Sequence, residues 1–222
     1  MARRTFLAVD KVLLVGGRLC LDFVNTTGSR ERKECRERLR SYDDVFIWSR
    51  RAGIVGESAA NALRKRAASR PVLATRVLVQ AIRFRECLYR VFRSSLERKA
   101  PASADIRLLS RMASIAREKQ RFEPDQSMWR WRWHAPSGQL DDVLWPIAES
   151  AISLLTSDDM DRLRQCGECD WLFIDETKNK SRRWCKKTCG DRVKARRYYK
   201  RRRLALRRVL ATQTLTNRTK SS

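Results

Sequence analysis

Two close pairs of cysteines are the residues whose type and spacing point most directly to chemistry. The 222-residue sequence contains 7 Cys, and four of them form Cys166-Gly-Glu-Cys169 and Cys185-Lys-Lys-Thr-Cys189, with fifteen residues between the pairs. This Cys-x2-Cys-x15-Cys-x3-Cys spacing is typical of a zinc site, in which four thiolates surround the metal as a tetrahedron. We therefore expect Cys166, Cys169, Cys185 and Cys189 to bind one Zn²⁺ ion.

Other uses of these cysteines are less favoured. Two disulfides would also satisfy four cysteines, but the sequence carries no export signal and thiols stay reduced in the cytoplasm. A redox Cys-x-x-Cys motif would need a thioredoxin-like strand and helix, which the flanking sequence lacks. The motif contains no His or carboxylate ligand, so nothing in it indicates the open coordination position of a catalytic zinc site. The zinc is therefore expected to be structural and to contribute roughly 10–16 kcal/mol to folding, so residues 161–205 should unfold without it.

The residues around the two pairs predict a small hairpin followed by a helix. Trp171–Ile174 favours a strand and Asp175–Asn179 favours a turn, while the second cysteine pair begins a helix. Trp171, Phe173 and Trp184 are interpreted as a mini-core around the metal rather than as base-stacking rings. A knuckle, a hairpin and a metal-bearing helix start together resemble a zinc ribbon or treble clef.

The sequence is strongly basic, and the excess charge is concentrated near these cysteines. It has 50 Lys and Arg against 25 Asp and Glu, a net charge of +25. Residues 161–222 alone hold 20 of the basic and 6 of the acidic residues. Charge of this density repels itself, so a polyanionic partner is favoured over a solvated helix face. A membrane surface is disfavoured because Tyr198 and Tyr199 stand where a Leu and Phe stripe would be needed.

A helix anchored by zinc would direct these cations outward. An α-helix fits the major groove of B-DNA, where Lys and Arg contact guanine edges and phosphates. DNA is therefore the favoured partner, and RNA stays open because the same charges suit it. Asp175 either closes the turn or orients Arg182 or Arg183. The residues expected to contact nucleic acid are Lys180, Arg182, Arg183, Lys186, Lys187, Arg192, Lys194, Arg196, Arg197, Lys200 and Arg201.

The first 160 residues predict a helical domain with one small hairpin. Arg18–Asn25 fits either a short strand or a helical turn. Trp129, Trp131 and Trp133 alternate with polar residues, which predicts a hairpin strand. We expect this hairpin to close over the helical core, in preference to serving as a base-stacking platform. Helical patterning is found at 45–52, 57–69, 73–92, 106–116 and 140–155.

The expected fold is mainly α, in three parts. Residues 1–160 form a helical domain, 161–210 form the zinc finger with its basic helix, and 211–222 form a disordered polar tail. No apolar run reaches the roughly 20 residues of a membrane helix, and no signal peptide is recognised, so a cytoplasmic location is expected. The sequence has no Gly-rich phosphate loop, nucleophile elbow or HExxH motif, which argues against an enzyme.

Two motifs resemble known bacterial families. The run Cys166-x-x-Cys-x-x-Leu-Phe-x-Asp-x-x-Lys-Asn-x-Ser-Arg-Arg-Trp-Cys185-x3-Cys189-Gly-Asp-Arg192 resembles the CGNR zinc finger, and Leu21-Asp-Phe-Val-Asn-Thr26 resembles the start of the ABATE domain. The resemblance implies a stress-induced transcription regulator that is associated with the nucleoid. It also implies that the cysteines bind zinc, that the finger contacts DNA, and that the helical domain senses a ligand.

Several residues keep two interpretations. Asp191 replaces the asparagine of the Cys-Gly-Asn-Arg motif, and a carboxylate would repel phosphate, so we interpret it as a helix cap. Asp22, Asn25 and Thr26 either line a ligand pocket or cap helices. His134 is expected at the surface or in the core without a catalytic role. The isolated cysteines Cys20, Cys35 and Cys87 are expected to be small buried hydrophobes rather than redox sensors. An RNA-binding protein and a ligand-binding domain tethered by its finger remain alternatives.

Overall fold

The computed structural model describes residues 8–30, 37–133 and 138–219, and leaves the side chains of residues 58 and 206–219 undescribed. The helices are α1 (Leu19–Val24), α2 (Tyr42–Arg51), α3 (Glu57–Ser69), α4 (Pro71–Leu96), α5 (Ser103–Glu118), α6 (Trp145–Leu155) and α7 (Lys187–Thr219). Strands β1 (Gln120–Asp125) and β2 (Met128–Trp133) form one antiparallel hairpin, and β3 (Leu163–Gln165) and β4 (Leu172–Ile174) form another. The predicted mainly α fold is confirmed.

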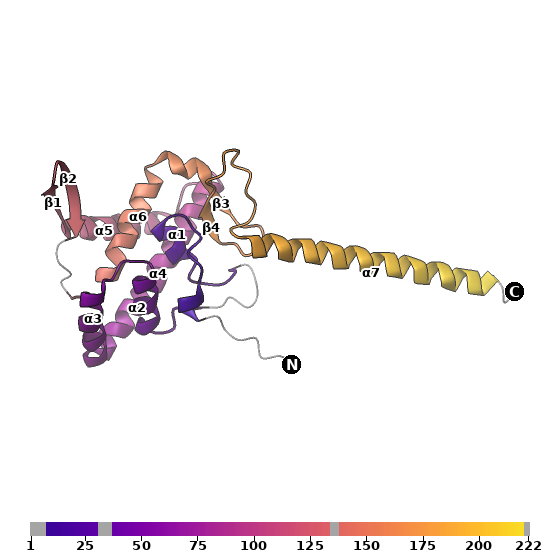
Figure 1. Ribbon diagram of the computed structural model, residues 1–222, viewed down its shortest axis with the longest axis horizontal. Coiled ribbons are helices and arrows are strands. Elements are labelled where there is room, and N and C mark those ends of the chain that lie inside the picture. Colours follow the sequence, from indigo (N-terminus) through magenta and orange to yellow (C-terminus); the bar gives the residue numbers. More distant parts are fainter. Residues whose placement is uncertain (1–7, 31–36, 134–137, 220–222) are drawn as a thin grey trace.

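The long helix α4 is the centre of the helical domain. Its apolar residues recur every three or four positions, and Ala81, Phe84 and Leu88 are completely buried. Helices α1, α2, α3 and α5 all pack against it, and α6 packs against α1 and α5 (Figure 1). The 3-10 turns η1 (Val9–Lys11), η2 (Asp142–Leu144) and η3 (Asp158–Arg162) complete the described elements.

Local signals explain why the helices begin and end where they do. Ser41 and Asp44 form a reciprocal capping box at the start of α2, which satisfies two backbone N–H groups there. Gly53 follows α2 with a φ of 74°, a left-handed conformation that glycine adopts without strain. Pro71 ends α3 and occupies the first turn of α4, where its missing N–H costs nothing. Arg18–Asn25 resolves to the short helix α1.

The tryptophan hairpin exists, but its expected packing over the core is wrong. Trp129, Trp131 and Trp133 are 62%, 52% and 39% exposed. The hairpin follows α5 and projects beyond the helices (Figure 1), so its rings meet one another instead of the core. Phe122 stacks on Trp129 with ring centroids 5.2 Å apart. The core is already filled by α4, α5 and α6. His134 lies outside the described residues.

The hairpin β3–β4 has two buried faces. Leu163, Leu172 and Ile174 belong to the core of the helical domain. Phe173, which points the opposite way because strand side chains alternate, belongs to a second apolar cluster that contains the four cysteines. Val12 from the N-terminal segment packs into that second cluster. The helical domain and the finger therefore share one small sheet.

The N-terminal segment is fastened to the same hairpin. The N–H of Ile174 donates to the carbonyl of Gly16 at 2.9 Å, and the N–H of Gly16 donates to Asp22 at 2.7 Å. A Cβ at Gly16 would lie 2.8 Å from the Cβ of Leu21, so a residue without a side chain is needed for this approach. The segment thus joins β4 to α1.

Helix α7 leaves the finger and projects away from the body (Figure 1). At about 1.5 Å per residue, its 33 residues extend about 50 Å. It continues to Thr219, into the stretch from residue 211 for which the sequence predicts disorder. No Gly or Pro follows Gly190, and Leu, Ala, Gln and Arg favour helix, so the chain contains no local signal to end α7 sooner.

Two of the isolated cysteines are buried, as expected. Burial raises the pKa of Cys20 to about 12 and that of Cys87 to about 11. Both thiols stay protonated at neutral pH and have no water access, which is the environment of an inert core residue. Cys35 lies outside the described residues.

We predict that Leu172→Ala lowers the stability of the helical domain as well as that of the finger. Leu172 is completely buried in the core of the helical domain, on the hairpin whose other face packs in the finger, and removal of such a side chain costs about 2–5 kcal/mol. Thermal unfolding followed by circular dichroism should give one transition at a lower temperature. Leu204→Ala, at a half-exposed position of α7, is the control. Two separate transitions in the variant, with the helical one unmoved, would contradict the shared core.

Candidate metal centre and basic helix

The four cysteine sulfurs form a compact cluster. The Sγ atom of Cys169 lies 3.6 Å from that of Cys185 and 3.7 Å from that of Cys189, and the sulfurs of Cys185 and Cys189 are 3.8 Å apart. With the sulfur of Cys166 included, all four sulfurs lie within 4.8 Å of one another. Zinc bound to sulfur at about 2.3 Å in a tetrahedron requires sulfurs about 3.8 Å apart. The cluster therefore fits this ion.

Two backbone elements present the sulfurs. The first pair forms a knuckle after β3, in which the N–H of Asp170 donates to the carbonyl of Cys166 at 3.1 Å and the N–H of Cys166 donates to that of Trp171 at 2.8 Å. In the second pair, Cys185 precedes α7 and Cys189 lies in its first turn. The metal site is thus surrounded by a knuckle, a hairpin and the start of a helix. This arrangement is that of the predicted treble-clef-like or zinc-ribbon-like finger.

An apolar shell surrounds the cysteines. Trp171 and Phe173 are buried beside them and Trp184 packs against the same cluster, which confirms the predicted mini-core. Val12 and Val15 complete the shell from a segment some 150 positions earlier in the chain. The sequence prediction missed these two valines, because apolar residues near the Gly16-Gly17 pair carry no local pattern that indicates contact with cysteines so far along the chain.

The sulfurs are linked by hydrogen bonds to one another and to a nearby cation. The thiols of Cys169 and Cys185 donate to Cys166, which lowers the pKa of Cys166 and raises the pKa of both donors, so thiolate character is greatest at Cys166. The guanidinium of Arg192 donates to the sulfur of Cys189 at 3.4 Å. Four thiolates around Zn²⁺ carry a net charge of about −2, so this cation offsets part of it.

Comparison with known families agrees with the site. Residues 17–158, more than half of the chain, match the ABATE family, whose description is "Putative stress-induced transcription regulator". The chain belongs to the ABATE family. Residues 162–202 match the CGNR zinc finger, so both predicted families occur in the predicted order. No curated protein matches this ABATE protein. Its four clustered cysteines form the site of one structural zinc ion.

Several of the predicted nucleic-acid contacts also have structural roles in the finger. Arg182 donates to the carbonyls of Trp184 and Cys185 and lies over the ring of Phe173. Asp175, which is completely buried, accepts from the N–H groups of Thr177 at 3.0 Å and Arg182 at 2.7 Å. It therefore closes the turn and orients Arg182, through the backbone of that residue.

Glu168 fixes the direction of α7. Arg196 makes a two-pronged ion pair with Glu168 of the knuckle, whose side chain is only 1% exposed. A bidentate pair of this kind fixes the geometry of both side chains. The sequence prediction assigned Arg196 to nucleic acid and did not identify Glu168, because nothing local links residues 28 positions apart.

The remaining predicted cations face solvent. Arg183 lies over the ring of Trp184 and Lys186 over that of Trp171. The structure places the others as exposed residues of the turn and of α7: Lys180, Lys187, Lys194, Arg197, Lys200 and Arg201. Their contact with nucleic acid stays a prediction.

Asp191 does not cap α7. The helix begins at Lys187, so Asp191 is its fifth residue and is exposed. The capping interpretation is wrong, because the helix starts between the two cysteines of the second pair and not after them. Asp191 is the single acidic residue in the sequence of α7.

Asp22, Asn25 and Thr26 are brought together at the joint between the two domains. The amide of Asn25 donates to the carbonyl of Leu172 at 2.8 Å and accepts from its N–H at 3.0 Å, as a neighbouring strand would. The hydroxyl of Thr26 donates to the carbonyl of Phe23 and accepts from Arg85. These bonds hold the joint, and a role in ligand binding stays a prediction.

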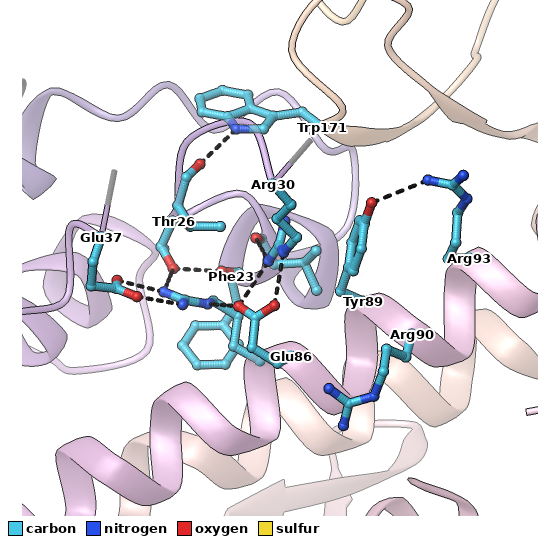
Figure 2. Close-up of polar contacts among 12 residues, drawn as sticks. Phe23, Thr26, Arg30, Glu37, Glu86, Tyr89, Arg90, Arg93 and Trp171 are labelled. Carbon is cyan, nitrogen blue, oxygen red and sulfur yellow. Dashed lines mark hydrogen bonds and ion pairs between the residues drawn. The ribbon is translucent and has the colours of Figure 1, made fainter. Parts of the chain in front are cut away.

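A partly buried ion cluster supports the loop that follows α1 (Figure 2). Arg85 donates to both carboxylate oxygens of Glu37, at 2.7 and 2.6 Å, and Arg30 donates to both oxygens of Glu86, at 2.8 and 3.1 Å. Burial opposes charge on Glu37, but Arg85 outweighs it and holds the pKa of Glu37 below its usual range. The indole of Trp171 donates to the carbonyl of Thr27 at 2.8 Å, which connects the loop to the finger.

A separate cavity of about 640 Å³ lies among α2, α3 and α4. Tyr42, Phe46 and Leu78 supply apolar lining, while Arg40 and Arg64 stand among the polar lining residues. This volume suits a small molecule. None of the three weak ligand candidates at the joint lines this cavity.

We predict about one zinc per chain in purified protein, and loss of that zinc in Cys185→Ser. A serine oxygen is a poorer zinc ligand than a thiolate, and the remaining cysteines cannot complete the tetrahedron. Elemental analysis measures the ratio. Cys87→Ala removes a buried thiol from α4 and should leave zinc content unchanged. A folded Cys185→Ser protein with full zinc content would refute the site.

We predict that Asp22→Asn stabilises the protein at about pH 8 more than at about pH 5. Burial raises the pKa of Asp22 from 3.8 to about 6, so the folded state holds the proton more tightly than the unfolded chain does. Stability therefore falls as pH rises from about 4 to about 6, because the folded state must then carry a buried charge. Asparagine keeps the oxygen that accepts from Gly16.

Melting temperatures of the variant and the parent at each pH give the comparison, which cancels any titration of the zinc site. Asp10→Asn, an exposed carboxylate, is the control. An equal effect of Asp22→Asn at both pH values would show that the carboxylate carries no cost of burial.

Proposed function

We propose that this protein is a transcription regulator that binds duplex DNA along the basic surface of α7. The observation that carries the proposal is a helix with twelve basic residues and one acidic residue, attached at its base through the four-cysteine site and an ion pair. The domain families support the regulatory part of the proposal.

Zinc gives the helix its direction. Cys189 lies inside α7 and Cys185 just before it, so the ion binds the helix start to the knuckle. The Arg196–Glu168 pair adds a second attachment two turns further along. With its base fixed at two points, α7 cannot swivel on the finger, and the protein enters the groove as a rigid unit. DNA binding is therefore proposed to depend on zinc.

The exposed cations suit B-DNA better than RNA. An α-helix of about 10–12 Å diameter fits the major groove of B-DNA, which is about 12 Å wide. The major groove of A-form RNA is deep and too narrow for side chains to read. Lys194, Arg197, Lys200 and Arg201 occupy the part of α7 beyond the finger, where phosphates on both sides of the groove are within reach.

A signal could reach the finger through the helical domain. The cavity among α2, α3 and α4 is the proposed effector site, and its lining includes Ala74 and Leu78 of α4. The same helix carries Arg85 and Glu86, which support the loop bonded to Trp171. An effector that shifted α4 would move the base of α7.

The proposed location is the cytoplasm, on the nucleoid. None of the helices in the described part of the chain combines the length and the apolar character that a membrane crossing requires. The proposal rests on the nucleic-acid role and on the family resemblance.

We predict that Arg197→Ala/Lys200→Ala/Arg201→Ala weakens duplex DNA binding and reduces its salt dependence. If each side chain neutralises one phosphate, the slope of log affinity against log salt should lose about 2–3. Fluorescence anisotropy with a labelled duplex at several salt concentrations measures both. Within the part of the chain that the structure describes, these three residues have no partner outside α7, so the fold should persist.

The matched control is Arg76→Ala/Arg107→Ala/Arg111→Ala, which removes the same charge from exposed positions of α4 and α5. If both triple variants lose affinity equally, bulk charge and not α7 is responsible. Competition with structured RNA distinguishes the two nucleic acids, since RNA that displaces the duplex at equal concentration would favour the alternative.

A further inference from the structure

The hairpin β1–β2 presents an uncovered aromatic face. The register pairs Phe122 with Trp131, Pro124 with Trp129 and Gln120 with Trp133, so these six residues share one face. Phe122 is 53% exposed, and the three tryptophans are exposed by 39–62%. Phe122 contacts both Trp129 and Trp131, with ring centroids 5.2 and 5.1 Å apart. We call this set the aromatic face.

The aromatic face carries no charge. Every charged residue of β1 and β2 belongs to the opposite face, where Asp125 pairs with Arg130 and Arg132, each at 3.1 Å. Among the described residues, the cation that lies over an aromatic-face ring is Arg117 of α5, 4.9 Å from the ring centre of Trp131. The guanidinium of Arg117 also pairs with Glu149 of α6, 3.3 Å away.

A two-stranded sheet of this kind needs a second layer. An isolated hairpin is marginally stable in water, and a sheet gains its stability by burying one face. Here the helical body covers neither face of the strands, since all twelve residues of β1 and β2 are exposed or only partly buried. A cluster of exposed aromatic rings marks an interaction site.

We propose that the aromatic face binds the same face of a second copy of this chain. The net charge of +25 opposes contact between two copies over most of their surfaces, and the aromatic face, whose own side chains are uncharged, is where such contact costs least. Two such faces packed together form a small β-sandwich with an aromatic interior. The hairpin lies at the opposite end of the body from α7 (Figure 1), so two copies can meet without a clash between their basic helices.

The size of the face predicts a weak dimer. At about 150–250 Å² for each buried aromatic side chain, the exposed fractions leave roughly 300–500 Å² per chain to be buried. Two copies would bury about 600–1,000 Å², which is at the low end for specific interfaces. The dimer should therefore form and dissociate reversibly at micromolar or higher concentrations.

A single nucleic-acid strand fits the face less well. Bases stack on exposed aromatic rings, but such platforms also need cations beside the rings to hold the phosphates. Arg117, the cation over Trp131, is already paired with Glu149. The arginines of β1 and β2 point from the other side of the sheet, where Asp125 pairs with two of them.

Sedimentation velocity of the full chain tests the proposal. A dilution series from about 500 µM to about 5 µM in raised salt covers the range expected for an interface of this size. The unmodified protein should pass from dimer to monomer across the series. Trp129→Ser and Trp131→Ser should each move the midpoint at least tenfold to higher concentration. Arg121→Ser alters the opposite face of the same hairpin and should not move it.

Three results would overturn the proposal. The first is a monomer throughout the series, which does not depend on how any variant folds. The second is a dimer with the same midpoint in all three variants. The third is a monomer whose tryptophan fluorescence is quenched by a short single-stranded oligonucleotide, with quenching lost in Trp129→Ser and kept in Arg121→Ser. None of these variants touches α7, so failure here leaves the DNA-binding proposal standing.

Discussion

The two-sided burial of the hairpin β3–β4 is the constraint on which the rest of the structure depends. One face of three-residue strands completes the core of the helical domain, and the other completes the shell around four sulfurs. Strands this short cannot be stable alone. The metal, the apolar shell and the helical core therefore hold one another in place, and the finger's orientation relative to the helices is fixed by packing as well as by chain connection.

The same constraint explains how a highly charged helix can be presented. Like charges three and four residues apart destabilise a helix, and α7 has many of them. The first turns of α7 are stabilised by other contacts. Cys189 belongs to the metal site, Arg192 donates to its sulfur, and Arg196 pairs with Glu168 of the knuckle. The beginning of α7 thus belongs to the finger, while residues 197–205 are exposed. A polyanion that binds there would relieve the repulsion among the cations of that stretch.

Local patterns predicted most of the elements and the metal ligands. The metal ligands are recognised from the spacing of four cysteines within one stretch of sequence. The boundaries of α3 and the capping of α2 likewise depend on a few adjacent residues. The joint was not predictable in this way: Val12, Asn25 and Glu168 each act on partners far along the chain. The tryptophan strand shows a different limit. The alternation of tryptophans with polar residues predicts a strand with a large apolar face, but it does not indicate whether the protein's own core covers that face.

The segment before α1 bears on how such proteins can be rearranged in evolution or by design. Val12 and Val15 lie outside both family matches, which begin at residues 17 and 162, yet they pack against the cysteines. A finger moved to another protein as residues 162–202 would leave behind two members of its own shell, along with Asn25, which bonds to Leu172. Its host would have to supply replacements. In this chain, the boundaries of the family matches differ from the boundaries of the units that pack together.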